Sequence, residues 1–279
     1  EIFSEFFVGM VEAGEAGGKL AETLYMAAEY LEKQANLKNK VKAAFAYPIV
    51  VSVMCLLIVS ALVVFVVPVF QKLYSQLHIT LPLPTLILIL VSEMARNYWW
   101  IIVPSVVGSV YLWRYYSKVP SVRARIDSIK LNMPVFGKIN RMVAASRFVR
   151  TLSMMLSSGI SVVEAIELSK KGVGNRVMQD IGDEIQEKIM TGSSLSEPMS
   201  EYDIFPPMIQ QLAGAGEEAG VLPEMLHKGV EFLDIKIERS INALLVKIEP
   251  ILSVALGLVV GSILMGVYLP MFDYMSQIK

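Results

Sequence analysis

The stretch 43–71, AAFAYPIVVSVMCLLIVSALVVFVVPVFQ, contains no charged residue and lies between Lys42 and Lys72. A helix needs about 20 apolar residues to cross the hydrocarbon core of a bilayer. This uncharged run is longer than that, and it predicts a transmembrane helix at 49–71. A signal peptide does not explain it, because a long segment with a helical pattern, 1–48, precedes it.

Two further runs without charge lie at 97–113 and 250–272. The second is long enough to span. The first is short for a span, but Tyr and Trp residues flank it at both ends, as they do at membrane interfaces. We therefore expect transmembrane helices at 97–116 and 250–272.

A fourth apolar stretch, 81–92, begins with Pro82 and Pro84. It is too short for a span. We expect an interfacial or re-entrant helix within a loop at 72–96 that leads into the second span. The alternative is a separate crossing of the membrane.

The distribution of charge predicts the orientation of the spans. Four lysines at 33–42 precede the first span, and nine Lys or Arg residues at 114–150 follow the second, opposed only by Asp127. Because cytoplasmic loops are rich in Lys and Arg, both flanks are expected in the cytoplasm. The loop 72–96 and the tail 273–279 then lie outside, whereas an extra crossing at 81–92 would separate the two basic flanks.

The composition fits a membrane protein with water-soluble portions. Of 279 residues, 54% are hydrophobic and 18% are charged, against about 25% charged in ordinary soluble domains. A net charge of −1 gives no indication of a nucleic-acid partner. The one cysteine, Cys55, excludes a disulfide within this sequence.

The sequence predicts an internal repeat at a constant offset of 202. Between 1–77 and 203–279, 18 of 77 positions are identical without a gap, and the matches include Gly, Pro and Glu as well as Leu. Two parallel copies of one unit should insert in the same direction, so an even number of spans should separate them. The spans at 49–71 and 97–116 supply that number, in agreement with the charge bias.

The first copy is shorter than the second. Helical segments at 139–202 have no counterpart before Glu1, and a complete first copy would need roughly 60 more residues upstream. We therefore expect 1–48 to be the C-terminal half of a first cytoplasmic helical domain. Since the sequence starts at Glu1 rather than Met, we also expect it to be a fragment.

The region 117–249 is predicted to be a second cytoplasmic domain of six helices. Apolar residues at helical spacing are interrupted at Gly159, at 174–175 and at Gly192. Ser-x-x-Glu capping boxes begin at Ser161 and Ser194. The last helix should run through Pro250 into the membrane. The fold class is therefore an all-α membrane protein, with six-helix cytoplasmic bundles and three transmembrane helices.

One apolar stripe of that last helix recurs in the first copy as Leu20, Leu24, Ala27 and Leu31. We expect the first-copy stripe to be covered by the 139–249 bundle, by another copy of the chain or by detergent. Four acidic residues lie on the opposite side from the stripe. They belong to a solvated face or form a partner surface: Glu22, Glu29, Glu224 and Glu231. Residues 151–249 carry 16 acidic and 8 basic residues, a local net charge of −8.

The sequence lacks the motifs of catalysis and cofactor binding. It has no complete nucleotide-binding loop, no nucleophile motif and no ligand cluster around either of its two histidines. No enzymatic activity, metal or cofactor is therefore expected. Uncharged spans disfavour a permease or channel component, which is the alternative function. The small outside portion disfavours a receptor.

Small residues four positions apart in the third span permit close helix packing. These are Ser253, Gly257 and Gly261, with Gly266 in a neighbouring row. The partner is either another span of the same chain or a second membrane chain.

Two segments, 14–20 and 216–222, both fit the pattern Gly-Glu-x-small-Gly-x-Leu. Between the two copies, 158–160, 163–165, 192–195 and 205–206 follow in the expected order. The ordered set resembles the inner-membrane platform proteins of type IV pilus assembly and type II secretion, the PilC and protein F family. The motif residues are Gly14, Glu15, Gly18, Leu20, Gly216, Glu217, Gly220, Leu222, Gly159 and Gly192.

The resemblance covers the whole chain and implies a non-enzymatic scaffold in the bacterial inner membrane with a periplasmic C-terminus. It implies coupling of a cytoplasmic hexameric assembly ATPase to polymerisation of pilin or pseudopilin helices. Other inner-membrane assembly proteins and further copies of the chain are also implied partners. We expect each Gly-Glu motif to form a tight corner in which the Glu caps the next helix; direct contact with a partner is the alternative.

Overall fold

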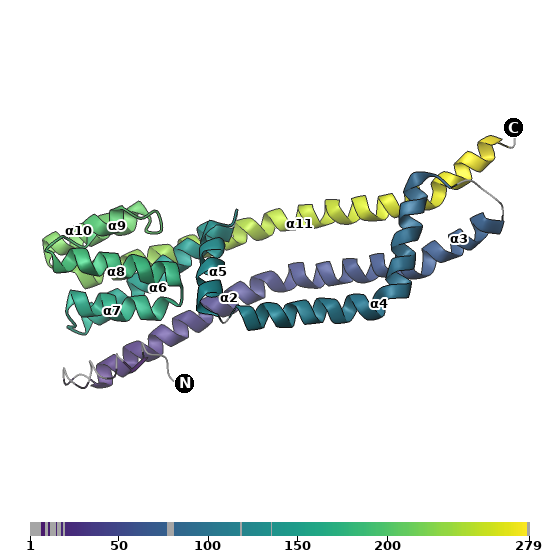
Figure 1. Ribbon diagram of the computed structural model, residues 1–279. Coiled ribbons are helices and arrows are strands. Elements are labelled where there is room, and N and C mark those ends of the chain that lie inside the picture. Colours follow the sequence, from purple (N-terminus) through teal and green to yellow (C-terminus); the bar gives the residue numbers. More distant parts are fainter. Residues whose placement is uncertain are drawn as a thin grey trace. The chain divides into compact units, whose positions relative to one another are not determined.

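The computed structural model describes residues 7–8, 11, 15, 18, 20–76, 81–117, 119–134 and 136–277. Every regular element in these ranges is a helix (Figure 1). The chain divides into two compact units. The first unit comprises Glu1–Val41 and Ser117–Leu244, and the second comprises Lys42–Tyr116 and Leu245–Lys279. The all-α fold is thus confirmed.

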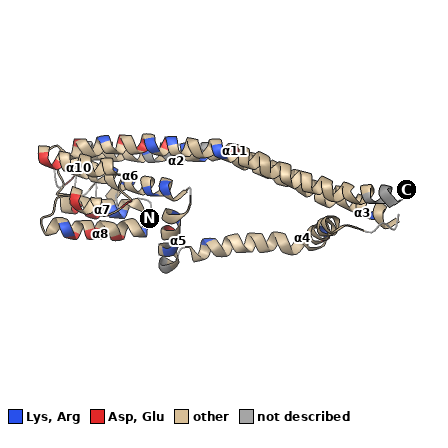
Figure 2. Ribbon diagram, turned by 90° about the horizontal axis from the view of Figure 1, so that it is seen from above, with Lys and Arg blue, Asp and Glu red and all other residues tan. Residues whose placement is uncertain are grey.

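In the part of the chain that the structure describes, three helices are long and apolar enough to cross a membrane, as the sequence predicts. The first runs from α2 (Leu20–Ala61) through a short π-helix, η1 (Leu62–Val66), into α3 (Val67–Gln76). The others are α4 (Leu83–Tyr116) and α11 (Leu222–Gln277). Figure 2 shows that Lys, Arg, Asp and Glu are concentrated on the first unit, whereas the long helices of the second are almost free of them.

Within the apolar stretch 81–92, residues 83–92 form the first part of α4, which continues into the second predicted span without a break. Figure 1 shows that α4 bends sharply between these two parts. The first part packs against both other apolar helices of the second unit, around Ile89, Val63 and Val267. The second part, at 97–116, leaves nearly all of its large side chains exposed.

The first unit contains α5 (Pro120–Asn132), α6 (Phe136–Ser157), α7 (Val162–Val173), α8 (Arg176–Met190), α9 (Ser196–Ser200) and α10 (Pro207–Ala219), with parts of α2 and α11. Six of these elements, α6 to α11, correspond to the predicted bundle. The helix α5 was not predicted, because its polar sequence lacks a clear apolar stripe. Asp127 of α5 is buried and accepts a hydrogen bond from the backbone N–H of Arg176 at 3.3 Å.

The predicted helix breaks are confirmed at three glycines. Gly159, Gly174 and Gly192 have φ angles of +83°, +70° and +98°, in the left-handed region that favours glycine. Ser161 caps α7 by accepting a hydrogen bond from the Glu164 N–H. The capping box at Ser194 is wrong, because α9 begins one position later and the side chain of its N-cap residue, Leu195, makes no capping hydrogen bond.

The bundle of the first unit covers only part of the first-copy stripe. Ala27 is buried in the core of the first unit, but Leu20, Leu24 and Leu31 are 40–47% exposed. The face that packs on the bundle is rotated toward Tyr30, which is 3% exposed and shares the core with residues of α6 to α11. The corresponding leucines of the second copy are buried: Leu222, Leu226 and Leu233.

Candidate functional site

The second Gly-Glu motif forms the corner between α10 and α11. Gly220 ends α10 with a φ of +69°, and its N–H donates to the Glu217 carbonyl at 3.2 Å. Gly216 is buried where the two helices approach. A Cβ on Gly216 would lie 2.9 Å from the Cα of Leu222 and 3.0 Å from the Cβ of Met225. Because the Leu222 Cα belongs to the backbone, a larger residue at position 216 would fit only if α10 and α11 moved apart.

The Glu217 carboxylate does cap a helix, but not the one that follows it. Both carboxylate oxygens accept from the backbone N–H of Leu195, at 2.7 and 2.8 Å. Leu195 is fully buried and precedes the first residue of α9. The prediction that Glu217 caps α11 is therefore wrong, because its carboxylate accepts from Leu195, which lies 22 residues earlier in the chain. Glu217 joins α10 to the start of α9.

The first Gly-Glu motif is described only in part. Gly14 lies outside the described residues, Glu15 is exposed, and Leu20 begins α2. Gly18 has a φ of +65°, and its N–H donates to the Glu15 carbonyl at 3.2 Å. This local geometry matches that of Gly220 and Glu217. Under an offset of 202, the residue equivalent to Leu195 would precede Glu1.

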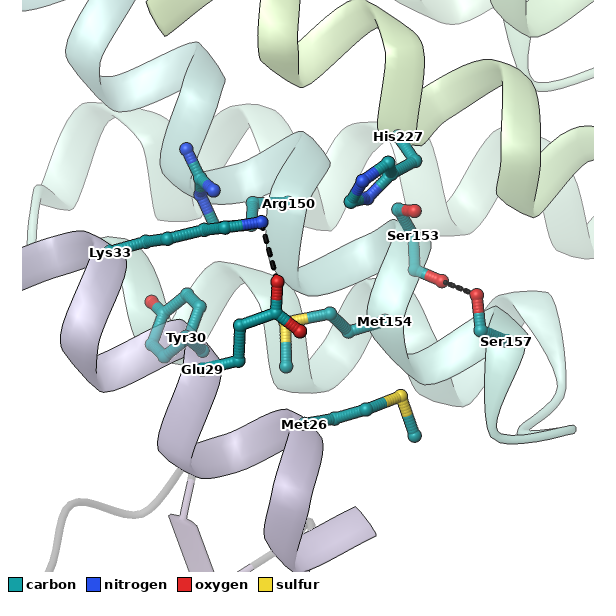
Figure 3. Close-up of a pocket in the computed structure, with 9 residues that line it drawn as sticks. All are labelled: Met26, Glu29, Tyr30, Lys33, Arg150, Ser153, Met154, Ser157 and His227. Carbon is teal, nitrogen blue, oxygen red and sulfur yellow. Dashed lines mark hydrogen bonds and ion pairs between the residues drawn. The ribbon is translucent and has the colours of Figure 1, made fainter. Parts of the chain in front are cut away.

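A pocket of about 230 Å³ lies between α2, α6 and α11 in the first unit (Figure 3). Met26, Glu29, Tyr30 and Lys33 line it from α2, and His227 lines it from α11. The residues of α6 in the wall are Arg150, Ser153, Met154 and Ser157. In Figure 3, Glu29 and Lys33 extend into this space from one side and His227 from another. We call it the α2 pocket.

Each basic side chain that lines the α2 pocket lies beside a carboxylate. Lys33 lies 2.7 Å from Glu29, and the His227 imidazole lies 3.8 Å from Glu231. Arg150 is 9% exposed and contacts Asp234 at 2.5 Å. The hydrogen bond from Lys33, with smaller contributions from His227 and Arg150, lowers the pKa of Glu29 below its usual value despite the opposing effect of burial. The carboxylates offset the charge of the basic side chains, and the three pairs lie within α2, within α11 and between α6 and α11.

The surroundings of the acidic candidates can be compared for Glu29, Glu224 and Glu231. Glu29 lines the α2 pocket, and Glu231 pairs with a histidine in its wall. Glu224 is exposed in the first turn of α11, and the side chain of Glu22 lies outside the described residues. Glu29 and Glu231 are exposed as well, but of the three described candidates only Glu224 takes no part in the α2 pocket or its ion pairs.

The small-residue positions of α11 separate into two groups. Gly266 is buried, and a Cβ there would lie 3.2 Å from Leu88 of α4. Nearby, Thr85 of α4 donates to the Gly266 carbonyl at 2.6 Å. By contrast, a Cβ on Gly257 or Gly261 would meet nothing within 4 Å. Packing within the chain thus accounts for Gly266, whereas Ser253, Gly257 and Gly261 are exposed.

Sequence reasoning missed the buried contacts that connect elements far apart in the chain. Asp234 accepts from Ser146 at 3.0 Å and from Arg150, 84 residues away. Asp234 and Arg150 belong to no sequence motif, so only the folded structure reveals that they form an ion pair. Among the described residues, no group of three His, Cys, Asp or Glu side chains is placed to hold a metal ion.

Comparison with known proteins identifies the family. The family model of type II secretion system protein F matches residues 1–68 and 148–270. The type IV pilus assembly protein PilC of Myxococcus xanthus is 38% identical over the whole of this chain and 67% of its own length. PilC of Thermus thermophilus is 36% identical over the whole of this chain and 69% of its own length.

Type II secretion system protein F of Aeromonas hydrophila is 29% identical over all of this chain and 72% of its own length. The matches thus extend across both units and include relatives from both kinds of machine. The chain belongs to the family of type II secretion system protein F and type IV pilus assembly protein PilC.

Proposed function

We propose that this chain is a non-enzymatic platform of the bacterial inner membrane in type IV pilus assembly or type II secretion. The observation that carries the proposal is its likeness, over its full length, to relatives named for those two processes. The proposed role is to couple a cytoplasmic assembly ATPase to polymerisation of pilin or pseudopilin. The charged helical unit and the three apolar helices provide a surface for each kind of partner.

The proposed ATPase contact lies on the first unit and includes the exposed residue Glu224. The proposed pilin contact lies on α11, where Gly257 and Gly261 leave room for a helix backbone. We also propose that the platform is a homo-oligomer, with residues 1–42 and 117–249 in the cytoplasm. The charge bias supports a periplasmic position for residues 72–96 and the C-terminal tail.

Site-specific photocrosslinking in bacterial membranes tests both contacts. A crosslinker at Glu224 should capture the assembly ATPase, and one at Gly261 should capture pilin or pseudopilin. The buried positions Met178 and Leu195 serve as negative controls for each. Capture of a second copy of the chain at Gly261, with no pilin, would move the pilin site elsewhere. Absence of both partners, with filament assembly unaffected by deletion of the gene, would contradict the platform role.

A further inference from the structure

A second pocket of the first unit differs in charge from the α2 pocket. Its volume is about 370 Å³, and it is lined by three cations, Lys138 and Arg141 of α6 and Lys236 of α11. Pro206 and Pro207 contribute to the wall before and at the start of α10, and Asp203 supplies the one carboxylate. We call it the basic pocket.

The cations of the basic pocket are not neutralised by ion pairs. Within the described part of the chain, none of them forms an ion pair with a carboxylate, whereas Lys33 and Arg150 of the α2 pocket each have one. The Arg141 Nε donates to the carbonyl of Leu131 at 2.9 Å, and the Lys236 Nζ lies 5.5 Å from the Phe232 ring centroid. These contacts hold the two side chains without cancelling their charge, so three cations face one carboxylate and the lining stays positive.

The backbone around the pocket fixes the position of the cations. The turn between α5 and α6 is tight, because a Cβ on Gly137 would lie 2.5 Å from the Leu131 carbonyl oxygen. That same carbonyl accepts the hydrogen bond from Arg141, which leaves the two Nη groups of the guanidinium for other acceptors. Lys138 lies in the first turn of α6, where the helix dipole also favours an anion.

We propose that the basic pocket binds a phosphate ester that carries hydroxyl groups. An Arg fork and two lysines match the charge and the several acceptor oxygens of a phosphate. The Asp203 carboxylate cannot contact the phosphate favourably, but it can accept a hydrogen bond from a neighbouring hydroxyl. The phosphate is that of an anionic lipid headgroup such as phosphatidylglycerol, or that of a free polyol phosphate. This site is independent of the proposed platform role.

Calorimetric titration of the full chain with glycerol 3-phosphate tests the proposal, with the protein in nanodiscs of neutral phosphatidylcholine. We expect binding that weakens with added salt. The double variant Lys138→Gln/Lys236→Gln should bind about tenfold more weakly or worse, since each lost charged contact is of that order. The matched control Lys171→Gln/Lys188→Gln removes the same charge from two lysines that pair with Glu167 and Glu201, and it should bind as the unsubstituted chain does.

Nanodiscs containing phosphatidylglycerol distinguish the two sources. Loss of glycerol 3-phosphate binding in them identifies a lipid headgroup as the occupant, and unchanged binding identifies a free phosphate ester. If the double variant misfolds by circular dichroism, Lys138→Gln alone replaces it, because Lys138 is exposed. Equal affinity of pocket variant and control overturns the proposal. The proposal is also overturned if the unsubstituted chain does not bind glycerol 3-phosphate. It is overturned as well if the chain binds a polyglutamate peptide through these lysines but does not bind the phosphate.

Discussion

At the scale of single residues, Glu217 sets the path of the chain into α9. Its carboxylate lies against the buried N–H of Leu195, which has no capping side chain of its own. An unsatisfied buried N–H costs about 1–3 kcal/mol. We therefore expect Glu217→Ala to lower the free energy of unfolding by that amount. Glu217→Gln should cost less, because the amide oxygen still accepts.

Chemical denaturation of the purified chain in detergent measures both changes, and Glu218→Ala, at the exposed neighbouring position, is the matched control. A fully stable Glu217→Ala protein that fails to assemble filaments would instead show that the carboxylate contacts a partner. Equal effects of Glu217→Ala and Glu218→Ala on stability would contradict the capping role.

The hydroxyl of Tyr202 donates to the Glu184 carboxylate, and this hydrogen bond, assisted by burial, raises the pKa of Tyr202 to about 12. The native state thus holds a proton that the unfolded state releases near pH 10. The resulting stability is complete below about pH 10 and is lost as the pH rises toward 12. At about pH 9 the unsubstituted chain should therefore have a higher free energy of unfolding than Tyr202→Phe, and this difference should decline by about pH 12. A constant difference would mean that the hydrogen bond does not govern this titration.

Single-residue reasoning from sequence succeeded where the signal was local. Gly159, Gly174 and Gly192 were predicted to interrupt helices, and a positive φ is a property of one residue and its neighbours. The partner of Glu217 could not be predicted, because Leu195 comes near only when α9 packs beside α10. The capping box predicted at Ser194 is wrong for a related reason. The Ser194 hydroxyl contacts the Ser196 hydroxyl, and the N–H of the next residue, Leu195, donates to Glu217 of a distant helix.

At the scale of elements, the long helices followed directly from hydrophobic runs, but their irregularities did not. The π-helix at Leu62–Val66 interrupts the regular α-helical hydrogen bonds. Here Ser92 of α4 donates to the Val63 carbonyl at 2.6 Å. No pattern in the apolar stretch 49–71 distinguishes these five residues, so the sequence predicted only a continuous helix.

We expect Ser92→Ala to destabilise the packing of α4 on η1. The change removes the hydroxyl that donates to the Val63 carbonyl in an apolar region, and hydrogen bonds between membrane helices average about 0.6 kcal/mol. Thermal unfolding in detergent should show a lower midpoint for Ser92→Ala. Ser109→Ala is the control, since that hydroxyl is exposed and bonds within its own helix. A shift in Ser109→Ala as large as that in Ser92→Ala would contradict this role.

At the scale of the whole molecule, the repeat remains a proposal that several paired features support. The helices α2 and α11 begin at Leu20 and Leu222, which the offset of 202 relates, and each contains a proline, Pro48 or Pro250, at the same offset. Gly18 and Gly220 share a left-handed φ. The copies differ at Leu62–Val66, which is a π-helix, whereas the equivalent part of α11 is regular.

The repeat and the charge bias lead to one topology, which cysteine labelling in intact cells can test. The native Cys55 is first replaced by Ala, so that each variant carries a single thiol. Ser75→Cys and Ser276→Cys report on the segments expected outside. Ser200→Cys, at an exposed position of α9, reports on the bundle expected inside.

A membrane-impermeant maleimide should label Ser75→Cys and Ser276→Cys in intact cells, and Ser200→Cys only after permeabilisation. If the repeat is parallel, the two outer positions should agree, because two spans separate them. The basic flanks at 33–42 and 114–150 are expected to keep 1–42 and 117–249 in the cytoplasm. Labelling of Ser75→Cys without Ser276→Cys would mean a fourth crossing and would contradict the parallel repeat. Labelling of Ser200→Cys alone would leave the repeat intact but invert the orientation, and with it the assignment of an ATPase to the charged unit.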